Sequence, residues 1–256
     1  MTSGWVSALA LPLGMAVAAG LVGCFAVMRR MTLASDAISH VALPGIGIAL
    51  ALRLNPVLGG LAALLLGTLL VWALEYKTRL PTESVIGVVF SAALAIGSML
   101  TSGEDLIDAL FGAPKAIGAA ETLLGLAAAG LVVFFVLRAR SRLVITLLSP
   151  EMARTAGIDV PRLNLLYLTA FAITVALGLR YLGVLLMGSL IIIPATTARH
   201  VSRNLAAMLV VSVVLAVAST LLGELAGSLL HREAGPLTIA MAAGFFVLSL
   251  LKRSEV

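Results

Sequence analysis

The sequence predicts an all-α, polytopic membrane protein with eight or nine transmembrane helices. Hydrophobic residues make up 61 % of the 256 residues, and the mean hydropathy is +1.14. Only 11 % of the residues are charged, whereas soluble domains carry about 25 %. Several apolar runs reach the roughly 20 residues that an α-helix needs to cross a bilayer. We therefore expect a single integral membrane domain over residues 1–256, surrounded by membrane lipid.

Nine apolar segments are candidate spans, separated by short polar or basic connections. They cover residues 5–28, 37–52, 56–74, 84–102, 122–137, 163–179, 181–198, 204–223 and 236–251. Arg29 and Arg30 follow the first segment, and no small-residue cleavage pattern does, which favours a retained span over a cleaved signal peptide. Only residues 53–55 separate the second and third segments. A count of eight, with one of these two segments tilted or partly re-entrant, is the alternative.

Lysine and arginine fall mainly on one side of the predicted membrane. With the N-terminus outside and nine spans, thirteen of the 17 lie in cytoplasmic segments and four lie outside. The cytoplasmic set is Arg29, Arg30, Lys77, Arg79, Arg138, Arg140, Arg142, Arg154, Arg162, Arg199, Arg203, Lys252 and Arg253; the external set is Arg53, Lys115, Arg180 and Arg232. This asymmetry follows the positive-inside rule and puts the C-terminus in the cytoplasm. It also accounts for the net charge of +5, so we expect no nucleic-acid partner.

The segment MTLASDAISHVALPGIGIAL, residues 31–50, places a carboxylate and an imidazole between apolar runs. Asp36 and His40 are four residues apart, so on a helix they share one face. Ionisable side chains inside a membrane usually face a cavity or a partner. This pair suits Zn²⁺, Mn²⁺ or Fe²⁺, and an incomplete ligand set suits an ion that must be released. The alternative, that Asp36 caps the second span, leaves His40 unexplained.

Pro44, Gly45 and Gly47 follow His40 closely. Proline removes a backbone donor, so we expect a helix break at Pro44. Broken helices at membrane depth expose carbonyl oxygens that can line an ion path, whereas an ordinary kink with small residues for close packing is the alternative. The topology puts the Asp36 and His40 pair just after the cytoplasmic Arg30, near the inner face unless the helix begins deep in the membrane.

The cytoplasmic connection 138–162 contains the stretch SPEMARTAGI, which has the signals of a short helix. Ser149 can cap it, Pro150 and Glu151 suit its first turn, and Gly157 can end it. On these residues alone, a docking helix for a soluble partner and a plain interfacial helix are equally open.

The remaining polar candidates have simpler explanations. Cys24 lies within an apolar run, where a single cysteine forms no intrachain disulfide and favours packing. Three others lie near helix ends or in turns, where a solvated or interfacial role is favoured: His200, Glu224 and His231. The external segment 103–121 begins with the acidic Glu104, Asp105 and Asp108, which attract cations by their field.

Motifs for enzyme chemistry are absent from the sequence. It has no G-x-x-x-x-G-K-[ST] loop for ATP, and no H-E-x-x-H or G-x-S-x-G motif for an intramembrane hydrolase. We therefore expect no enzyme activity and no bound cofactor, with any metal ion handled as a transported substrate.

Four stretches resemble the membrane permease subunits of bacterial ABC importers for zinc, manganese and iron. They are SDAISHVALPGIGIAL, TRLPTESVIGVVFSAALAIG, SPEMARTAGI and YLGVLLMGSLIIIPATTAR, and the C-terminal PLTIAMAAGFFVLSLL fits as well. The matches run in order over nearly the whole chain.

The resemblance implies a homodimer, or a pair of related permeases, in the bacterial inner membrane. It further implies a dimer of ATP-binding cassette ATPases on the cytoplasmic side and an extracytoplasmic metal-binding protein on the other. Asp36 and His40 match family positions that face the metal path. The segment similar to the ATPase-docking helix contains Ser149, Pro150, Glu151, Met152, Ala153, Arg154 and Gly157.

Two other functions fit the same residues. A proton-coupled metal carrier would use Asp36 and His40 as its relay and would need no ATPase. A non-transporting membrane scaffold would give no metal phenotype on deletion.

Overall fold

The computed structural model is a bundle of α-helices, and the part of the chain that it describes is residues 2–78, 80–100, 118–179 and 182–251. The helices are α1 (Thr2–Met28), α2 (Thr32–His40), α3 (Ala42–Ala51), α4 (Pro56–Thr78), α5 (Thr82–Leu100), α7 (Ala119–Leu148), α8 (Pro150–Thr155), α9 (Val160–Gly178), α10 (Gly183–Val201), α11 (Leu205–Leu230) and α12 (Ala234–Leu251). The acidic Glu104, Asp105 and Asp108 lie outside the described residues.

In the part of the chain that the structure describes, each predicted span is mainly helical. Among the described residues, seven helices are long and apolar enough to cross a membrane: α1, α4, α5, α7, α9, α11 and α12. The 19-residue α10 corresponds to the predicted span 181–198. The predicted span 37–52 is instead two short helices, α2 and α3, and it begins five residues earlier than expected.

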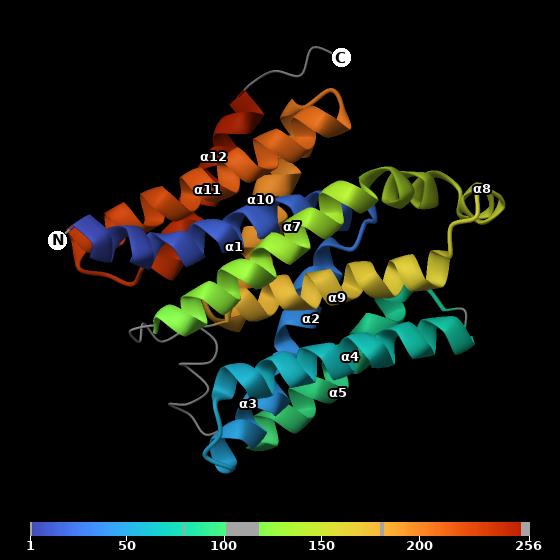
Figure 1. Ribbon diagram of the computed structural model, residues 1–256, viewed down its shortest axis with the longest axis horizontal. Coiled ribbons are helices and arrows are strands. Elements are labelled where there is room, and N and C mark those ends of the chain that lie inside the picture. Colours follow the sequence, from blue (N-terminus) through green and yellow to red (C-terminus); the bar gives the residue numbers. More distant parts are fainter. Residues whose placement is uncertain (1, 79, 101–117, 180–181, 252–256) are drawn as a thin grey trace.

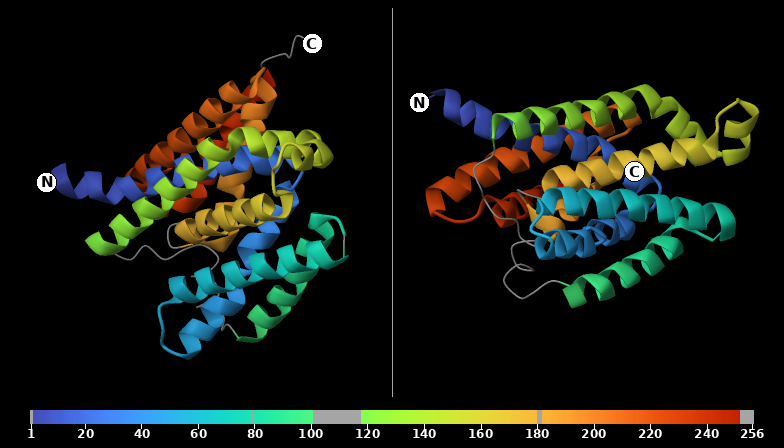
Figure 2. Two further views of the ribbon diagram at one scale, coloured as in Figure 1. Left: turned by 45° about the vertical axis from the view of Figure 1, so that its right-hand side comes forward. Right: turned by 60° about the horizontal axis from the view of Figure 1, so that its bottom comes forward.

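Helix α1 forms the centre of the bundle. It contacts α7, α9, α10 and α11, and its side chains from Met15 to Val27 are almost all buried (Figure 1). Gly23 permits the closest contact, because a Cβ there would collide with the carbonyl oxygen of Ile191 in α10. Helices α3, α4 and α5 form a group on one flank of this core, with α11 and α12 on the other (Figures 1 and 2). Helix α2 packs between α5 of the first group and α10 of the core.

The basic helix ends gather at one end of the bundle. Arg29 after α1, Lys77 at the end of α4 and Arg154 of α8 line the same cavity. Arg199, at the end of α10, donates from Nη1 to the carbonyl oxygen of Val27 at 3.2 Å. Because Arg29 and Lys77 lie at the same end of the bundle, the chain must cross to the other end through α2 and α3 and return through α4. This arrangement favours nine crossings over eight.

Candidate functional site

The predicted helix break is present, but it lies at Val41 and not at Pro44. Helix α2 ends at His40 and α3 begins at Ala42. In a continuous helix the amide of residue 44 would bond to the carbonyl of His40, whereas a proline has no N–H and its ring clashes with that carbonyl. The amide of Val41 instead donates to the carbonyl oxygen of Ile38 at 3.0 Å. Pro44 thus breaks the helix one turn before its own position.

His40 is deeper in the bundle than its place after Arg30 suggests. Its ring centroid lies 5.6 Å from that of Phe90, with the ring planes tilted by 52°. Phe90 is close to the midpoint of the 19-residue α5. The partly buried His40 therefore lies level with the middle of α5, one of the helices long and apolar enough to span a membrane.

Asp36 is an interior residue of α2, so the alternative, that it caps the second span, is wrong. The helix begins at Thr32, and its N-cap residue Met31 makes no side-chain capping bond. Asp36 and His40 belong to one helix at the spacing that puts them on one face. The side chain of Asp36 lies outside the part of the chain that the structure describes. Joint metal contact by the pair therefore stays a prediction.

In the described part of the chain, no group of three or more His, Cys, Asp or Glu side chains is placed to hold an ion. The other sequence candidates lie elsewhere. His200 is exposed at the end of α10, and Glu224 is partly buried in α11. His231 is exposed and ends α11 in a left-handed conformation (φ 51°). Cys24 is buried, and its Sγ donates to the carbonyl oxygen of Met208 at 3.6 Å.

Helix α8 forms with the boundaries that the sequence predicts. Ser149 is its N-cap and accepts from the amide of Met152 at 3.2 Å, while Pro150 occupies the first helical position. Gly157 (φ 75°) ends it in a left-handed conformation, and the amide of Ile158 donates to the carbonyl oxygen of Ala153 at 2.9 Å. This pairing is a Schellman motif. Ala153 is buried, whereas Met152 is 65 % exposed.

A polar junction that sequence reasoning missed joins four helices near α8. Nη1 of Arg29 donates to Oδ1 of Asn164, and Nδ2 of Asn164 donates to Oε2 of Glu75 at 2.8 Å. The hydroxyl of Thr82 donates to Oε1 of Glu75 at 2.9 Å. The junction therefore connects the ends of α1 and α4 with the starts of α5 and α9. In the sequence, only two polar side chains indicated this junction: the carboxylate of Glu75 in the last turn of α4 and the amide of Asn164 in the second turn of α9.

The guanidinium of Arg29 is held on several sides. Its Cζ lies 4.3 Å from the centre of the Tyr167 ring, a cation–π distance. Burial lowers the pKa of Arg29, and Tyr167 and Glu75 oppose that shift. Because an arginine in a protein stays protonated, its buried charge depends on these partners.

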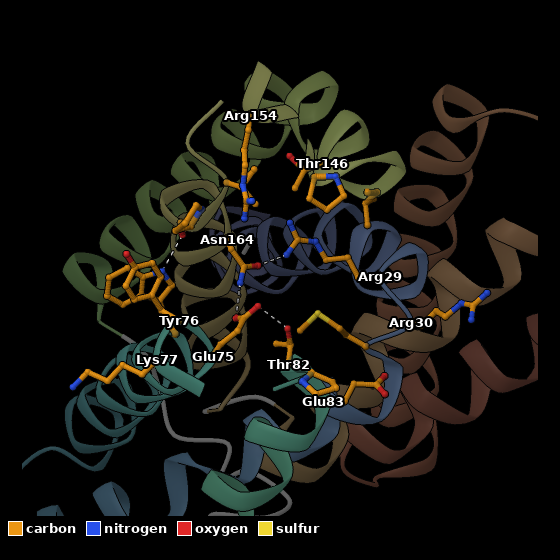
Figure 3. A pocket seen from close by; sticks show the side chains of 17 residues that line it. Arg29, Arg30, Glu75, Tyr76, Lys77, Thr82, Glu83, Thr146, Arg154 and Asn164 are labelled. Carbon is orange, nitrogen blue, oxygen red and sulfur yellow. Dashed lines mark hydrogen bonds between the residues drawn. The ribbon is translucent and has the colours of Figure 1, made fainter. Parts of the chain in front are cut away.

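A cavity of about 1090 Å³ opens beside the junction (Figure 3). Arg154 and Pro150 of α8 line it together with Arg29, Glu75 and Asn164. Figure 3 shows Asn164 between Arg29 and Glu75, with the side chain of Arg154 extending from α8 toward Asn164 from above in this view. The junction and α8 thus face a common space at the basic end of the bundle.

Comparison with known proteins identifies the family. The sequence model described as the ABC 3 transport family matches residues 2–253. The chain belongs to the ABC 3 transport family. It is therefore a multi-pass membrane permease of the ABC transporter type, whose role is transport and not catalysis.

Family members of assigned function resemble this chain over most of their length. It is 30 % identical to the high-affinity zinc uptake system membrane protein ZnuB of Haemophilus influenzae, with 92 % of each chain covered. It is 28 % identical to the manganese import system permease protein ScaB of Streptococcus parasanguinis, covering 95 % of this chain and 88 % of that one. The solved structure of PsaBC from Streptococcus pneumoniae in complex with Fab matches with a TM-score of 0.83 at 26 % identity, covering 97 % and 91 % of the two chains.

Proposed function

We propose that this chain is the membrane-spanning subunit of an ABC importer that moves Zn²⁺, Mn²⁺ or Fe²⁺ into the cytoplasm. The observation that carries the proposal is the family match over residues 2–253, supported by relatives named for zinc uptake and manganese import. The sequence has no phosphate-binding loop, so a separate subunit hydrolyses ATP. The metal ion is the substrate, and the proposal requires no resident cofactor.

The ion passes Asp36 and His40 on its way through the membrane. Two features support this assignment: the position of His40 beside Phe90, level with the middle of α5, and the helix break at Val41. The break also places His40 at the end of a short helix, and interrupted helices within a membrane are typical of ion-handling sites. An imidazole and a carboxylate together suit a divalent transition metal.

Helix α8 is the docking element for the ATPase. The proposed surface comprises Ser149, Pro150, Glu151, Met152, Ala153, Arg154 and Gly157. The capped ends hold this short helix in a fixed shape, and the exposed Met152, Glu151 and Arg154 offer apolar and charged contacts to a soluble partner. The buried Ala153 anchors the helix to the bundle.

The working assembly contains two permeases, either two copies of this chain or this chain and a related one. Two ATPase subunits bind on the cytoplasmic side, and a metal-binding protein delivers the ion on the other. The clustering of Arg29, Lys77 and Arg154 at one end supports a bacterial inner-membrane orientation with that end in the cytoplasm and the N-terminus outside.

Metal uptake in a deletion strain tests the function and the site together. The wild-type chain should restore growth on scarce Zn²⁺, Mn²⁺ or Fe²⁺, and the ion that restores growth identifies the substrate. The double variant Asp36→Ala/His40→Ala should reduce the uptake rate at least tenfold, about 1.4 kcal/mol in transition-state free energy, because the ion loses both side-chain ligands. His200→Ala, which removes an exposed histidine, is the matched control.

The outcomes separate the rival functions. Uptake that survives in Asp36→Ala/His40→Ala shows that these residues do not form the ion path. Uptake that follows the proton gradient and persists without an ATPase subunit identifies a proton-coupled carrier instead. Failure of the wild-type chain to alter metal uptake supports a scaffold role.

A further inference from the structure

The polar junction consists of Arg29, Asn164, Glu75 and Thr82. It lies between two helices to which the proposed function gives different roles: α8 docks the ATPase, and α2 handles the ion. Asn164 is in the second turn of α9, and only residues 156–159 separate α9 from α8. Arg29 comes three residues before the start of α2, the helix of Asp36 and His40. The Arg29–Asn164 hydrogen bond thus links the start of α9, which follows the proposed docking helix, to the segment that precedes the broken helix.

The bonding pattern makes the junction sensitive to displacement. Asn164 is the central member, since its amide oxygen accepts from Arg29 while its amide nitrogen donates to Glu75 at 2.8 Å. An N–H···O hydrogen bond has a heavy-atom distance of about 2.7–3.2 Å, and a contact at about 3.6 Å is no longer one. A shift of the α9 start by about 1 Å therefore breaks or reorients both bonds. The adjoining cavity of about 1090 Å³ gives the side chains room to rearrange.

We propose that this junction transmits movement of α8 through the start of α9 to α2, and so couples ATP hydrolysis in the partner to the ion path at His40. The inference rests on the proposed function. Arg29, Asn164 and Glu75 are positioning residues in this scheme: they contact neither the ion nor the nucleotide. Thr82 donates to the second carboxylate oxygen of Glu75 and so connects the start of α5 to the junction. Helix α5 also carries Phe90, whose ring contacts that of His40.

A pair of isosteric substitutions tests the junction without altering its size. Asn164→Asp sets a second carboxylate against Glu75, which breaks that hydrogen bond and adds like-charge repulsion. In Glu75→Gln, the side-chain oxygen can still accept from Asn164, and the side-chain amide can donate to the Thr82 hydroxyl, which then acts as the acceptor. The substitution removes the negative charge that compensates Arg29. In the double variant, the new carboxylate at 164 accepts from Arg29 and from the new amide at 75, whose oxygen accepts from Thr82. All three bonds and the net charge are then restored.

The measurement is the number of metal ions transported for each ATP hydrolysed. The full chain is reconstituted in liposomes with its ATPase and metal-binding partner, with Zn²⁺ and Mn²⁺ as probes. Asn164→Asp should bind the ATPase normally and hydrolyse ATP, yet transport about tenfold fewer ions for each ATP. Glu75→Gln should lower the ratio in the wild-type background and raise it in the Asn164→Asp background. A residue that only stabilises the fold would change the amount of folded transporter, and not the number of ions transported for each ATP hydrolysed.

Two variants at the same end of the bundle serve as controls. Asn204→Asp keeps the cap of α11, in which Oδ1 of Asn204 accepts from the amide of Ala207 at 2.9 Å. Glu83→Gln removes an exposed carboxylate that lines the same cavity next to Thr82. Both should retain the wild-type ratio.

The results distinguish failure of the inference from failure of the proposed function. If the wild-type chain shows no ATP-dependent metal uptake, the proposed function is wrong. If wild-type uptake is normal and Asn164→Asp keeps the wild-type ratio, the junction does not couple the two elements. A ratio lowered equally in the Asn164→Asp single variant and the double variant also overturns the inference.

Discussion

Buried hydroxyl groups in this bundle donate to backbone carbonyls of α1. The phenol of Tyr167 in α9 donates to the carbonyl oxygen of Val22 at 3.1 Å, and the hydroxyl of Ser212 in α11 donates to that of Gly20 at 2.8 Å. Both side chains are fully buried. In a membrane protein such bonds satisfy polar groups that find no water, and each contributes modestly to stability. They fix α1 in register against two neighbours.

Tyr167→Phe tests one of these bonds. It removes the hydroxyl but keeps the ring against Arg29, so we expect a loss of about 0.6 kcal/mol in the free energy of unfolding. The measurement is the apparent melting temperature in detergent. Tyr76→Phe is the matched control, since Tyr76 is 67 % exposed and stacks on Trp72 through its ring. Equal melting temperatures for the two variants would show that the Val22 contact adds nothing.

At the scale of elements, α3 and α4 cross more closely than side chains other than glycine permit. A Cβ added at Gly45 would collide with the carbonyl oxygen of Gly59, and the reverse is also true. Ala49 and Ala63 lie one turn further along each helix, so both helices have the small-xxx-small pattern. This crossing anchors α3, a helix of only ten residues, after the break at Val41.

Gly45→Ala should separate the two helices. Overpacking of this kind costs about 1–3 kcal/mol, so the apparent melting temperature should fall. Gly130→Ala in α7 is the control, because nothing lies within 4 Å of the added methyl group. That control should be stabilised by about 0.5–1 kcal/mol, since alanine is the better helix former. A Gly45→Ala protein as stable as wild type would contradict the close crossing.

At the scale of the whole molecule, alternating helix directions bring the basic connections to one end. The proposed orientation places Arg140 of α7 in the cytoplasm and Leu54, between α3 and α4, outside; both residues are exposed. Leu54→Cys should react with a membrane-impermeant maleimide in intact cells. Arg140→Cys should react only after the membrane is permeabilised. The wild-type chain is the unlabelled control, because its single cysteine, Cys24, is buried. Labelling in the opposite pattern would invert the topology.

Sequence patterns predicted features whose cause is local. The spans follow from runs of apolar residues, and α8 follows from Ser149, Pro150 and Gly157, which set its ends through bonds to nearby backbone. The break near Pro44 was predicted for the right reason, the missing N–H, but its position was not. A proline disrupts the turn before it, so α2 ends at His40.

The sequence by itself determined that this is a helical membrane protein, which connections are basic, and where the short capped helix and the proposed ion-handling pair lie along the chain. These properties depend on composition and on spacing within one segment. Only the tertiary structure decided the depth of His40, because that depends on α2 packing between α5 and α10. The junction of Arg29, Asn164 and Glu75 likewise required the fold, since its members are 46 to 135 residues apart and meet only where four helix ends converge.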